Sequence, residues 1–346
     1  MSKFNYNTVY VTRYMGAKYK LLDLIIPEIK KIVPPTGTVI DLMSGTQSVG
    51  YALKKDYRII SNDIQFYSQV FAKALIVNNS KRNVRDDFPK DFDNLEPNGF
   101  SENWFVKTYK NTYFSEGQAK QISAIRSRID EISDLDKQYI YLTALATAMS
   151  TCQSSSGHFA QFMPQDHPRI KVLRDMNLFE YFAKKCKEIE IELSEYQNFA
   201  FGMEGSELLE SSEIKELAPE GSLVYLDPPY SSAQYSRYYH LLETVFLNDE
   251  PQVNFKGLYR PDRFQSDFSS PKRVKHAFER IFRNCANLGY NLLISYSDGG
   301  LIELSEMKVL CKKYFRNVEL KYELYPHSMQ GRGQVENRHE VIFVCK

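Results

Sequence analysis

Leu223-Val224-Tyr225-Leu226-Asp227-Pro228-Pro229-Tyr230 is an apolar run that leads into an acid, two prolines and an aromatic residue. The run predicts a buried strand, and the prolines predict its end because neither can donate a hydrogen bond to a neighbouring strand. Asp227 and Tyr230 are therefore expected on a stiff turn at the carboxyl end of a strand, where open α/β sheets bind ligands. An acid that accepts from an amino group, beside a ring that stacks on a planar heterocycle, favours chemistry on the exocyclic nitrogen of a base. The plainer alternative is a Pro-Pro turn with an incidental acid and tyrosine.

The rest of the chain predicts an α/β fold around that strand. In the first third, helical patterns alternate with short apolar runs, and this alternation predicts a parallel sheet with right-handed crossovers. The predicted strands are residues 39–42, 58–61, 198–201, 222–226 and 291–296, with a hairpin formed by 318–325 and 341–344. The predicted helices between them are residues 18–32, 48–55, 64–77 and 204–218.

A change of pattern near residue 86 predicts a helical insert. Residues 86–100 are rich in Asp, Asn, Pro and Gly, and we expect an irregular connector there. Ser115 and Gln118 fit a capping box that opens a helix. The predicted helices of this region are 115–132, 139–152 and 171–191. The chain therefore divides into a catalytic domain formed by residues 1–87 and 195–346 and a mainly helical insert, 88–194.

Composition and charge indicate a globular chain without a general affinity for nucleic acid. Of its 346 residues, 43% are hydrophobic and 25% are charged, which is typical of globular domains. The net charge is +1, so any contact with nucleic acid must come from a local patch. Residues 254–283 are a candidate, because they hold eight basic and three acidic residues with interleaved aromatic rings. A solvated loop and helix face is the favoured interpretation of that segment alone.

The cysteines and the hydropathy of the chain indicate the cellular compartment. The five cysteines are odd in number and none are paired at short spacing, which argues against a disulfide framework or a zinc site. Residues 1–10 contain no apolar signal segment, and the longest helix-like apolar stretch, 139–149, is too short to span a bilayer. We therefore expect a cytoplasmic protein that contacts no membrane.

A second motif lies between the first predicted strand and its helix. The stretch from Asp41 to Gly50 contains Gly45 in a turn where a ligand can approach the backbone closely. Asp63 follows 22 residues after Asp41, at the spacing of the acid that binds a ribose in nucleotide-binding units. Asp63 is also a good N-cap for a helix beginning at Ile64. Neither a P-loop nor a G-x-G-x-x-G fingerprint is present, so the loop suits a nucleoside without a pyrophosphate, and S-adenosylmethionine is one.

Read in order, the motifs resemble those of the Dam-like, alpha-group N6-adenine DNA methyltransferases. The motifs that carry the resemblance are Tyr14-Met15-Gly16-Ala17-Lys18, Asp41 to Gly50, Asn62-Asp63-Ile64 and Asp227 to Tyr230. Further similarity occurs at Gln234-Tyr235, 239–244, 295–301 and 337–340. The alpha-group order places a target-recognition region between the cofactor loop and the catalytic tetrapeptide, which is where the helical insert falls.

The resemblance implies a fold, a cofactor and a set of site residues. It implies a Rossmann-like S-adenosylmethionine-dependent methyltransferase sheet with an inserted target-recognition subdomain. The implied cofactor-binding residues are Tyr14, Gly16, Lys18, Asp41, Gly45, Asp63, Glu204 and Asp227, and the implied catalytic residues are Asp227, Pro228, Pro229 and Tyr230. No metal is implied. The family usually has glycine where this chain has Gln47, so either that side chain points outward or cofactor affinity is reduced.

The function implied by the resemblance is site-specific methylation of adenine N6 in double-stranded DNA by base flipping. Asp227 and the Pro228 carbonyl would accept hydrogen bonds from N6, and Tyr230 would stack on the base, with its ring mattering more than its hydroxyl. A role in restriction-modification or DNA marking makes a cognate restriction endonuclease a candidate partner. Two alternatives stay open: an RNA adenine methyltransferase with the same pocket, and a catalytically degenerate DNA-binding module.

Overall fold

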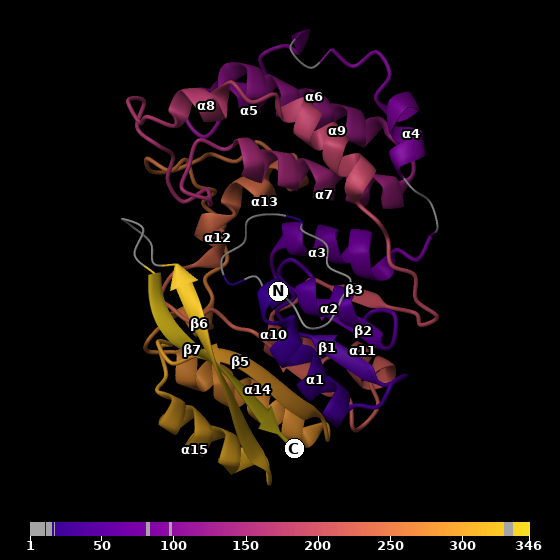
Figure 1. Cartoon of the computed structure of the whole chain (residues 1–346), viewed down its shortest axis with the longest axis vertical. Coiled ribbons are helices and arrows are strands. Elements are labelled where there is room, and N and C mark those ends of the chain that lie inside the picture. Colours follow the sequence, from indigo (N-terminus) through magenta and orange to yellow (C-terminus); the bar gives the residue numbers. More distant parts are fainter. Residues whose placement is uncertain (1–10, 12–15, 17, 81–83, 97–98, 329–334) are drawn as a thin grey trace.

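A single seven-stranded sheet is the frame of the molecule (Figure 1). The structure is a computed structural model that describes residues 11, 16, 18–80, 84–96, 99–328 and 335–346. In these residues the strands run in the order β3-β2-β1-β4-β5-β7-β6. Their bounds are β1 (Thr38–Asp41), β2 (Arg58–Asn62), β3 (Phe199–Phe201), β4 (Leu223–Leu226), β5 (Asn291–Ser297), β6 (Val318–Ser328) and β7 (Val335–Cys345).

The sheet is mixed, and its topology creates a binding crevice. Strands β1 to β5 are parallel, whereas β7 runs antiparallel to both β5 and β6. Val39 of β1 lies between Ile59 of β2 and Leu223 of β4. The chain moves outward in one direction through β2 and β3 and in the other through β4 and β5, so the crevice at the carboxyl ends of β1 and β4 is the expected ligand site. The predicted α/β fold with a mixed sheet is confirmed.

Helices cover both faces of the sheet because successive strand residues point to opposite sides. Val39 and Ile59 are buried in the core on one face, whereas Ile40 and Ile60 are buried in the core on the other. The first core is covered by η1 (Lys18–Lys20), α1 (Leu22–Ile32), α2 (Ser48–Leu53), α3 (Phe66–Ala72) and a π-helix, η2 (Lys73–Val77). The second is covered by α10 (Gly205–Glu210), α11 (Ser212–Leu217), α14 (Val274–Asn287) and α15 (Leu304–Tyr314).

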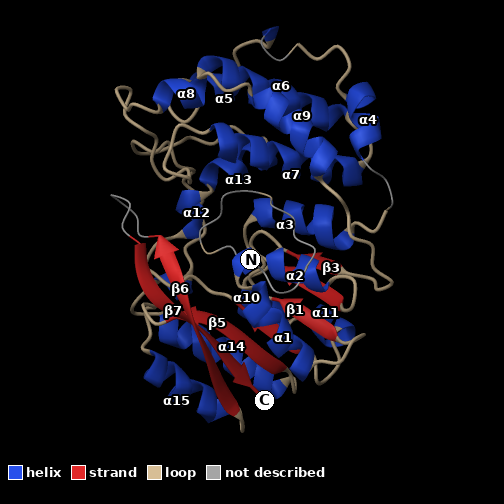
Figure 2. Cartoon of the chain, in the orientation of Figure 1, coloured by secondary structure: helices blue, strands red, loops and turns tan. Residues whose placement is uncertain are grey.

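A layer of helices lies to one side of the strands, in the upper part of the view in Figure 2. It consists of α4 (Val84–Asp91), α5 (Trp104–Tyr109), α6 (Glu116–Glu131), α7 (Leu135–Cys152), α8 (Ile170–Arg174) and α9 (Leu178–Glu188). The capping box of Ser115 and Gln118 opens α6 as predicted. Between this layer and the sheet lie α12 (Tyr235–Tyr238) and α13 (His240–Leu247), and a short helix, η4 (Asp267–Ser269), follows them in the chain.

Three local predictions were wrong, two of them where a contact with a distant part of the chain decides the structure. Residues 86–100 are not all irregular, since α4 forms there with Phe88 buried against Phe92 and Phe182. The predicted helix 171–191 is broken between α8 and α9. At the break, Gln118 Nε2 of α6 donates to the carbonyls of Leu173 at 2.7 Å and Met176 at 3.0 Å. The predicted helix 204–218 is divided at Ser211, whose side chain caps α11.

Candidate active site

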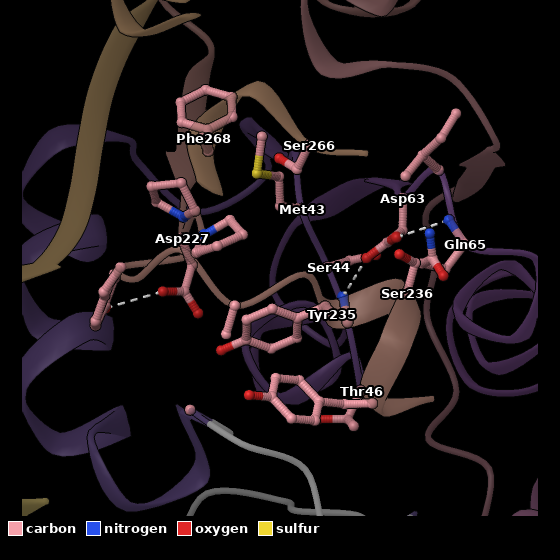
Figure 3. Close-up of a pocket in the computed structure, with 18 of the residues that line it drawn as sticks. Met43, Ser44, Thr46, Asp63, Gln65, Asp227, Tyr235, Ser236, Ser266 and Phe268 are labelled. Atoms are coloured by element: carbon pink, nitrogen blue, oxygen red, sulfur yellow. Dashed lines mark hydrogen bonds between the residues drawn. The ribbon is translucent and has the colours of Figure 1, made fainter. Parts of the chain in front are cut away.

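A cleft of about 1220 Å³ opens at the carboxyl ends of the parallel strands. Figure 3 shows Asp227 on one side and Asp63 on the other, with Met43 and Tyr235 between them. The sequence-predicted residues that line the cleft are Gly16, Lys18, Asp41, Gly45, Asp63, Glu204, Asp227, Pro228, Pro229 and Tyr230. Tyr14, the remaining predicted residue, lies outside the described residues.

Asp227 directly follows β4 and forms an ion pair. Lys18 Nζ lies 2.8 Å from Asp227 Oδ1, and the Tyr230 hydroxyl oxygen lies 3.0 Å from the same carboxylate oxygen. Among the residues that the structure describes, none donates a hydrogen bond to Oδ2. Burial raises the pKa of Asp227, and the charge of Lys18 opposes this effect. Asp227 therefore has one oxygen held by the protein and one that can accept from a ligand.

Lys18 sits in the short helix before α1 and belongs to the same cluster. Its ammonium group donates to the Gly16 carbonyl at 2.9 Å and lies 4.9 Å from the centre of the Tyr230 ring. Burial lowers the pKa of Lys18, but the charges of Asp227 and Glu340 more than compensate, so its pKa is raised overall. Lys18 therefore stays charged and partly neutralises an acidic site.

Tyr230 is fixed through its hydroxyl as well as through its ring. The hydroxyl oxygen lies 2.5 Å from Glu340 Oε1 of β7 and 3.2 Å from Ser295 Oγ of β5. The ring contacts Tyr296 edge to face, with centroids 5.1 Å apart. Sequence reasoning gave Glu340 and Ser295 no role, although both lie in stretches that carry the family resemblance. Nothing in their local sequence indicates that two distant strands meet this tyrosine.

The loop after β1 is fastened to the end of β2. Ser44 donates to the Asn62 carbonyl through its backbone N–H at 3.0 Å and through its hydroxyl at 3.1 Å. Gly45 has a φ of +49°, and its N–H donates to Asp63 Oδ2 at 2.9 Å. This is the left-handed region that glycine adopts without strain. The turn therefore presents bare backbone to the cleft, as the sequence predicted.

Gln47 also has a left-handed backbone, but its side chain points into the protein. Its φ is +67°, and the residue has no exposed surface. Nε2 donates to Ser44 Oγ at 2.9 Å and to the Ser68 carbonyl at 3.2 Å, while Oε1 accepts from Ser61 Oγ at 2.7 Å. The outward orientation considered from the sequence is therefore wrong. Gln47 instead joins the cofactor loop to β2 and α3.

Asp63 uses both carboxylate oxygens on backbone N–H groups. Oδ2 accepts from Gly45, and Oδ1 accepts from Gln65 at 2.9 Å. Asp63 is not the N-cap of a helix beginning at Ile64, because α3 begins two residues later, at Phe66. The N–H groups of Phe66 and Tyr67 donate instead to Glu243 of α13, each at 3.0 Å. Burial raises the pKa of Asp63, and the hydrogen bonds that its carboxylate accepts from the N–H groups of Gln65 and Gly45 oppose this shift.

Asp41 is a deeply buried acid of the cleft, at 2% exposure. Its Oδ2 accepts from the Gly50 N–H at 3.3 Å. Burial and the negative charge of Asp227 raise the pKa of Asp41 to about 8. Acidic side chains outnumber the lysines and arginines that line the cleft, so the site favours a cationic ligand. The acids are Asp41, Asp63, Glu204, Asp227, Asp267 and Glu340, and the bases are Lys18, Lys20, Arg237 and Arg280.

Glu204 connects the cleft to the basic segment 254–283. Its Oε2 caps α10 by accepting from the Ser206 N–H at 3.0 Å, and it pairs with Arg280 Nη2 at 3.2 Å. Elsewhere in the segment, Arg260 is buried and paired with Asp249 and Asp262. Much of the segment's positive charge is therefore neutralised within the protein rather than presented to a partner.

Two further properties belong to the described part of the chain. No helix there combines the length and apolar character needed to cross a bilayer. Within the same residues, no three His, Cys, Asp or Glu side chains are grouped as metal ligands. All five cysteines are free and buried.

The fold and the cleft define a Rossmann-like methyltransferase: a parallel sheet with a glycine turn after β1, an acid after β2 and Asp-Pro-Pro-Tyr after β4. The model of the D12 class N6 adenine-specific DNA methyltransferase family matches residues 14–293 of the 346. The chain therefore belongs to this family, and the resemblance seen in the sequence is confirmed at family level.

Several curated methylases are similar to the chain over most of its length. It is 28% identical to Modification methylase LlaI of Lactococcus lactis subsp. lactis, over 96% of this chain and 55% of that protein. It is also 28% identical to Type II methyltransferase M.FokI of Planomicrobium okeanokoites, over 96% of this chain and 52% of that protein. Type II methyltransferase M.NlaIII of Neisseria lactamica is 25% identical, over 87% of this chain and 88% of that protein. The chain thus spans about half the length of the first two and most of the third.

Proposed function

We propose that the chain transfers a methyl group from S-adenosylmethionine to adenine N6 at specific sites in double-stranded DNA. The observation that carries this proposal is the arrangement of Asp227 and Tyr230 after β4. One carboxylate oxygen is held by Lys18, the other can accept from a ligand, and an anchored ring lies beside it. Membership of the adenine-specific family supports the same target atom.

The chemistry follows from how weak a nucleophile the target nitrogen is. The lone pair of adenine N6 is delocalised into the ring, so the protein must aim it. Asp227 Oδ2 and the Pro228 carbonyl accept one N6 hydrogen each, which holds the nitrogen toward a tetrahedral geometry. Positioning of this kind is worth roughly several kcal/mol of the barrier. When bound, S-adenosylmethionine supplies a methyl group already activated by its sulfonium.

The residues around the β1 loop fit that cofactor. Gly45 leaves the turn without a side chain, and Gly16 lines the cleft nearby. Asp63 oxygens each accept one N–H and keep a second lone pair, which is available to a ribose hydroxyl. The excess of acids suits the positive sulfonium and ammonium groups. Gln47 no longer argues for a degenerate site, because its side chain is buried away from the cleft.

The target base must leave the duplex to reach this site. Adenine N6 is paired inside the double helix, so base extrusion is required, and Tyr230 would restore part of the lost stacking. Base–aromatic stacking is worth about 1–3 kcal/mol. The cleft is larger than the roughly 300–1,000 Å³ of a typical small-molecule site, which leaves room for both a nucleoside cofactor and a base.

We assign target recognition to the helical insert, residues 88–194, and catalysis to residues 1–87 and 195–346. The insert reaches the cleft through Ser156, Gly157 and His158, which line it. Several similar proteins are named modification or Type II methylases, which supports a restriction-modification role with a cognate endonuclease in the cytoplasm.

The test is to sequence modified bases in DNA from cells that express the chain. We expect N6-methyladenine at one recurring sequence context, and its absence in cells that express Asp227→Ala. Methyladenine at the same level in both cultures, or in neither, would refute the proposal. Labelled methyl incorporation into matched duplex DNA and RNA separates the RNA alternative, because a DNA enzyme labels only the duplex DNA. Calorimetry with S-adenosylmethionine tests the degenerate-module alternative, because a DNA-binding module without the cofactor would release no heat.

A further inference from the structure

Glu340 is a fully buried carboxylate that lies behind the Asp227–Tyr230 motif. It sits on β7, the antiparallel strand next to β5, and has no exposed surface. Its Oε1 accepts from the Ser295 hydroxyl at 2.8 Å and lies 2.5 Å from the Tyr230 hydroxyl and 3.7 Å from Lys18 Nζ. A buried carboxylate is costly to maintain without a charge partner and hydrogen bonds, and these contacts of Oε1 come from the Asp227–Tyr230 cluster or from Ser295 beside it.

The hydrogen-bond geometry ties the Tyr230 ring to Glu340. A phenol has one hydrogen to donate, and the nearest acceptor to the Tyr230 hydroxyl is Glu340 Oε1, closer than Asp227 Oδ1 at 3.0 Å. A carboxylate is also a stronger acceptor than the neutral Ser295 hydroxyl, which lies 3.2 Å from the Tyr230 hydroxyl. With its hydroxyl held on β7 and its backbone held after β4, the ring is fixed at both ends. Its plane is therefore set before a base arrives.

Glu340 also shares the charge of Lys18 with Asp227. Two carboxylates face one ammonium group, at 2.8 Å for Asp227 and 3.7 Å for Glu340. The negative charge of Glu340 raises the pKa of Asp227, although burial is the larger cause. Ionisable groups of the described residues that also interact with this cluster include Asp41 of β1, Tyr225 of β4 and Tyr235 of α12.

We propose that Glu340 is a positioning residue for methyl transfer, which fixes the plane of the Tyr230 ring and the charge shared by Lys18 and Asp227. The proposal rests on the proposed adenine methylation. The family match ends at residue 293, so membership of the family assigns nothing to Glu340. Glu340 touches no substrate and acts through Tyr230 and Lys18.

Glu340→Gln is the main test because it keeps the shape of the side chain and removes its charge. We expect kcat for methylation of duplex DNA to fall by about tenfold or more, since small misplacements of reacting groups cost up to about 10²-fold. Binding of S-adenosylmethionine should change by less than about twofold, because Glu340 faces the tyrosine side of the cluster. The acid limb of the kcat/KM profile should move to lower pH, because Asp227 loses a neighbouring negative charge. A purely structural role would not move that limb.

Two further variants make the result decisive. If Glu340 acts partly through Tyr230, the loss of kcat in the double variant Glu340→Gln/Tyr230→Phe should be smaller than the product of the two single losses. Glu323→Gln is the matched control, because Glu323 pairs in register with Glu340 on β6 and its side chain is exposed. It should leave kcat and the pH profile unchanged.

The outcomes separate this inference from the proposed function. A wild-type chain that methylates no adenine refutes the function. If the wild-type chain methylates adenine, the inference about Glu340 is refuted when Glu340→Gln is equally fast and the acid limb of its pH profile does not move. Additive losses of kcat in the double variant also refute this inference but leave the proposed function intact. If Glu340→Gln fails to fold, Ser295→Ala decides instead, because it removes the hydroxyl that orients Glu340 with little change in volume. Wild-type kcat and an unmoved acid limb in Ser295→Ala would then overturn the inference.

Discussion

At the residue scale, the role of Asp227 rests on its second oxygen. Lys18 Nζ and the Tyr230 hydroxyl lie against Oδ1, which leaves Oδ2 as the proposed acceptor for N6. A substitution that removes the carboxylate removes that acceptor. We expect Asp227→Ala to lower kcat by at least about 10²–10³-fold, the cost of losing one preorganised partner of a reacting group. Fold should be retained, because Lys18 keeps Glu340 as a partner. Labelled methyl incorporation and a thermal melt measure the two effects, and wild-type-like turnover by a folded Asp227→Ala protein would contradict the assignment.

Asp41 predicts a pH dependence of cofactor binding. Its pKa is raised to about 8 from the ordinary aspartate value of 3.8, chiefly by burial and then by the charge of Asp227. Between these values the folded protein holds a proton that the unfolded chain has lost, so the free energy of unfolding contributed by Asp41 falls as pH rises across this window. A cationic ligand favours the ionised acid, so affinity for S-adenosylmethionine should rise with pH and level off above about 8.

Asp41→Asn tests this expectation because the amide keeps an oxygen for the Gly50 N–H but cannot ionise. The variant should bind S-adenosylmethionine about tenfold more weakly at pH 8, a loss of roughly 1.4 kcal/mol. It should lose most of the rise in affinity between pH 6 and pH 8, and its melting temperature should fall less over the same range. Calorimetry and thermal melts at three pH values give both curves. Parallel pH curves for the two proteins would show that another group is responsible.

At the element scale, Gln47 joins the β1 loop to β2 and α3. Gln47→Gly relieves a left-handed backbone, worth about 1–2 kcal/mol, but removes several hydrogen bonds worth about 0.5–1.5 kcal/mol each and leaves their buried partners unpaired. The losses outweigh the gain, so we expect net destabilisation of about 1–3 kcal/mol and weaker cofactor binding. Gln47→Ala should be worse, because it loses the bonds and keeps the strain. Urea unfolding and calorimetry measure both effects; tighter cofactor binding by the glycine variant would overturn this reasoning.

Local pattern was sufficient for the strands but not for helix ends. The apolar runs at β1, β2, β4 and β5 are buried on both faces, so their composition alone predicts them. The start of α3 depends on Glu243, which is 177 residues away from Phe66 in the chain. The helix α4 depends on Phe88 meeting the aromatic rings of α9. Such contacts leave no periodic signal near the element that they stabilise.

At the scale of the whole molecule, the parallel sheet explains why part of the site could be predicted. Loops that follow β1, β2 and β4 meet at one edge, so Gly45, Asp63 and Asp227 could be grouped from the order of strands alone. Glu340 could not, because it arrives on an antiparallel strand whose place in the sheet depends on the C-terminal hairpin. The same holds for the contact of the Lys18 ammonium group with both Asp227 and Glu340, because the fold brings the three side chains together.

The hydrophobic core also joins the helical layer to the sheet. One continuous cluster of buried side chains contains Val39 of β1, Phe71 of α3 and Phe88 of α4. The two parts to which we assign target recognition and catalysis therefore share one hydrophobic core. We expect a single unfolding transition, with the near-ultraviolet and far-ultraviolet circular dichroism signals changing together.

Phe88→Ala tests this coupling from the helical layer, because Phe88 lies in α4. Phe88 packs on Phe92 at 5.0 Å and on Phe182 at 5.7 Å between ring centroids, and truncating such a ring costs about 3–5 kcal/mol. Because the core is shared, the whole transition should move to lower denaturant, and saturating S-adenosylmethionine should move it back by mass action. Val172→Ala on α8 is the matched control, since its side chain is 68% exposed and its loss should leave the midpoint unchanged. Two separated transitions in Phe88→Ala, with the cofactor shifting only one, would show instead that the helical layer unfolds independently of the sheet.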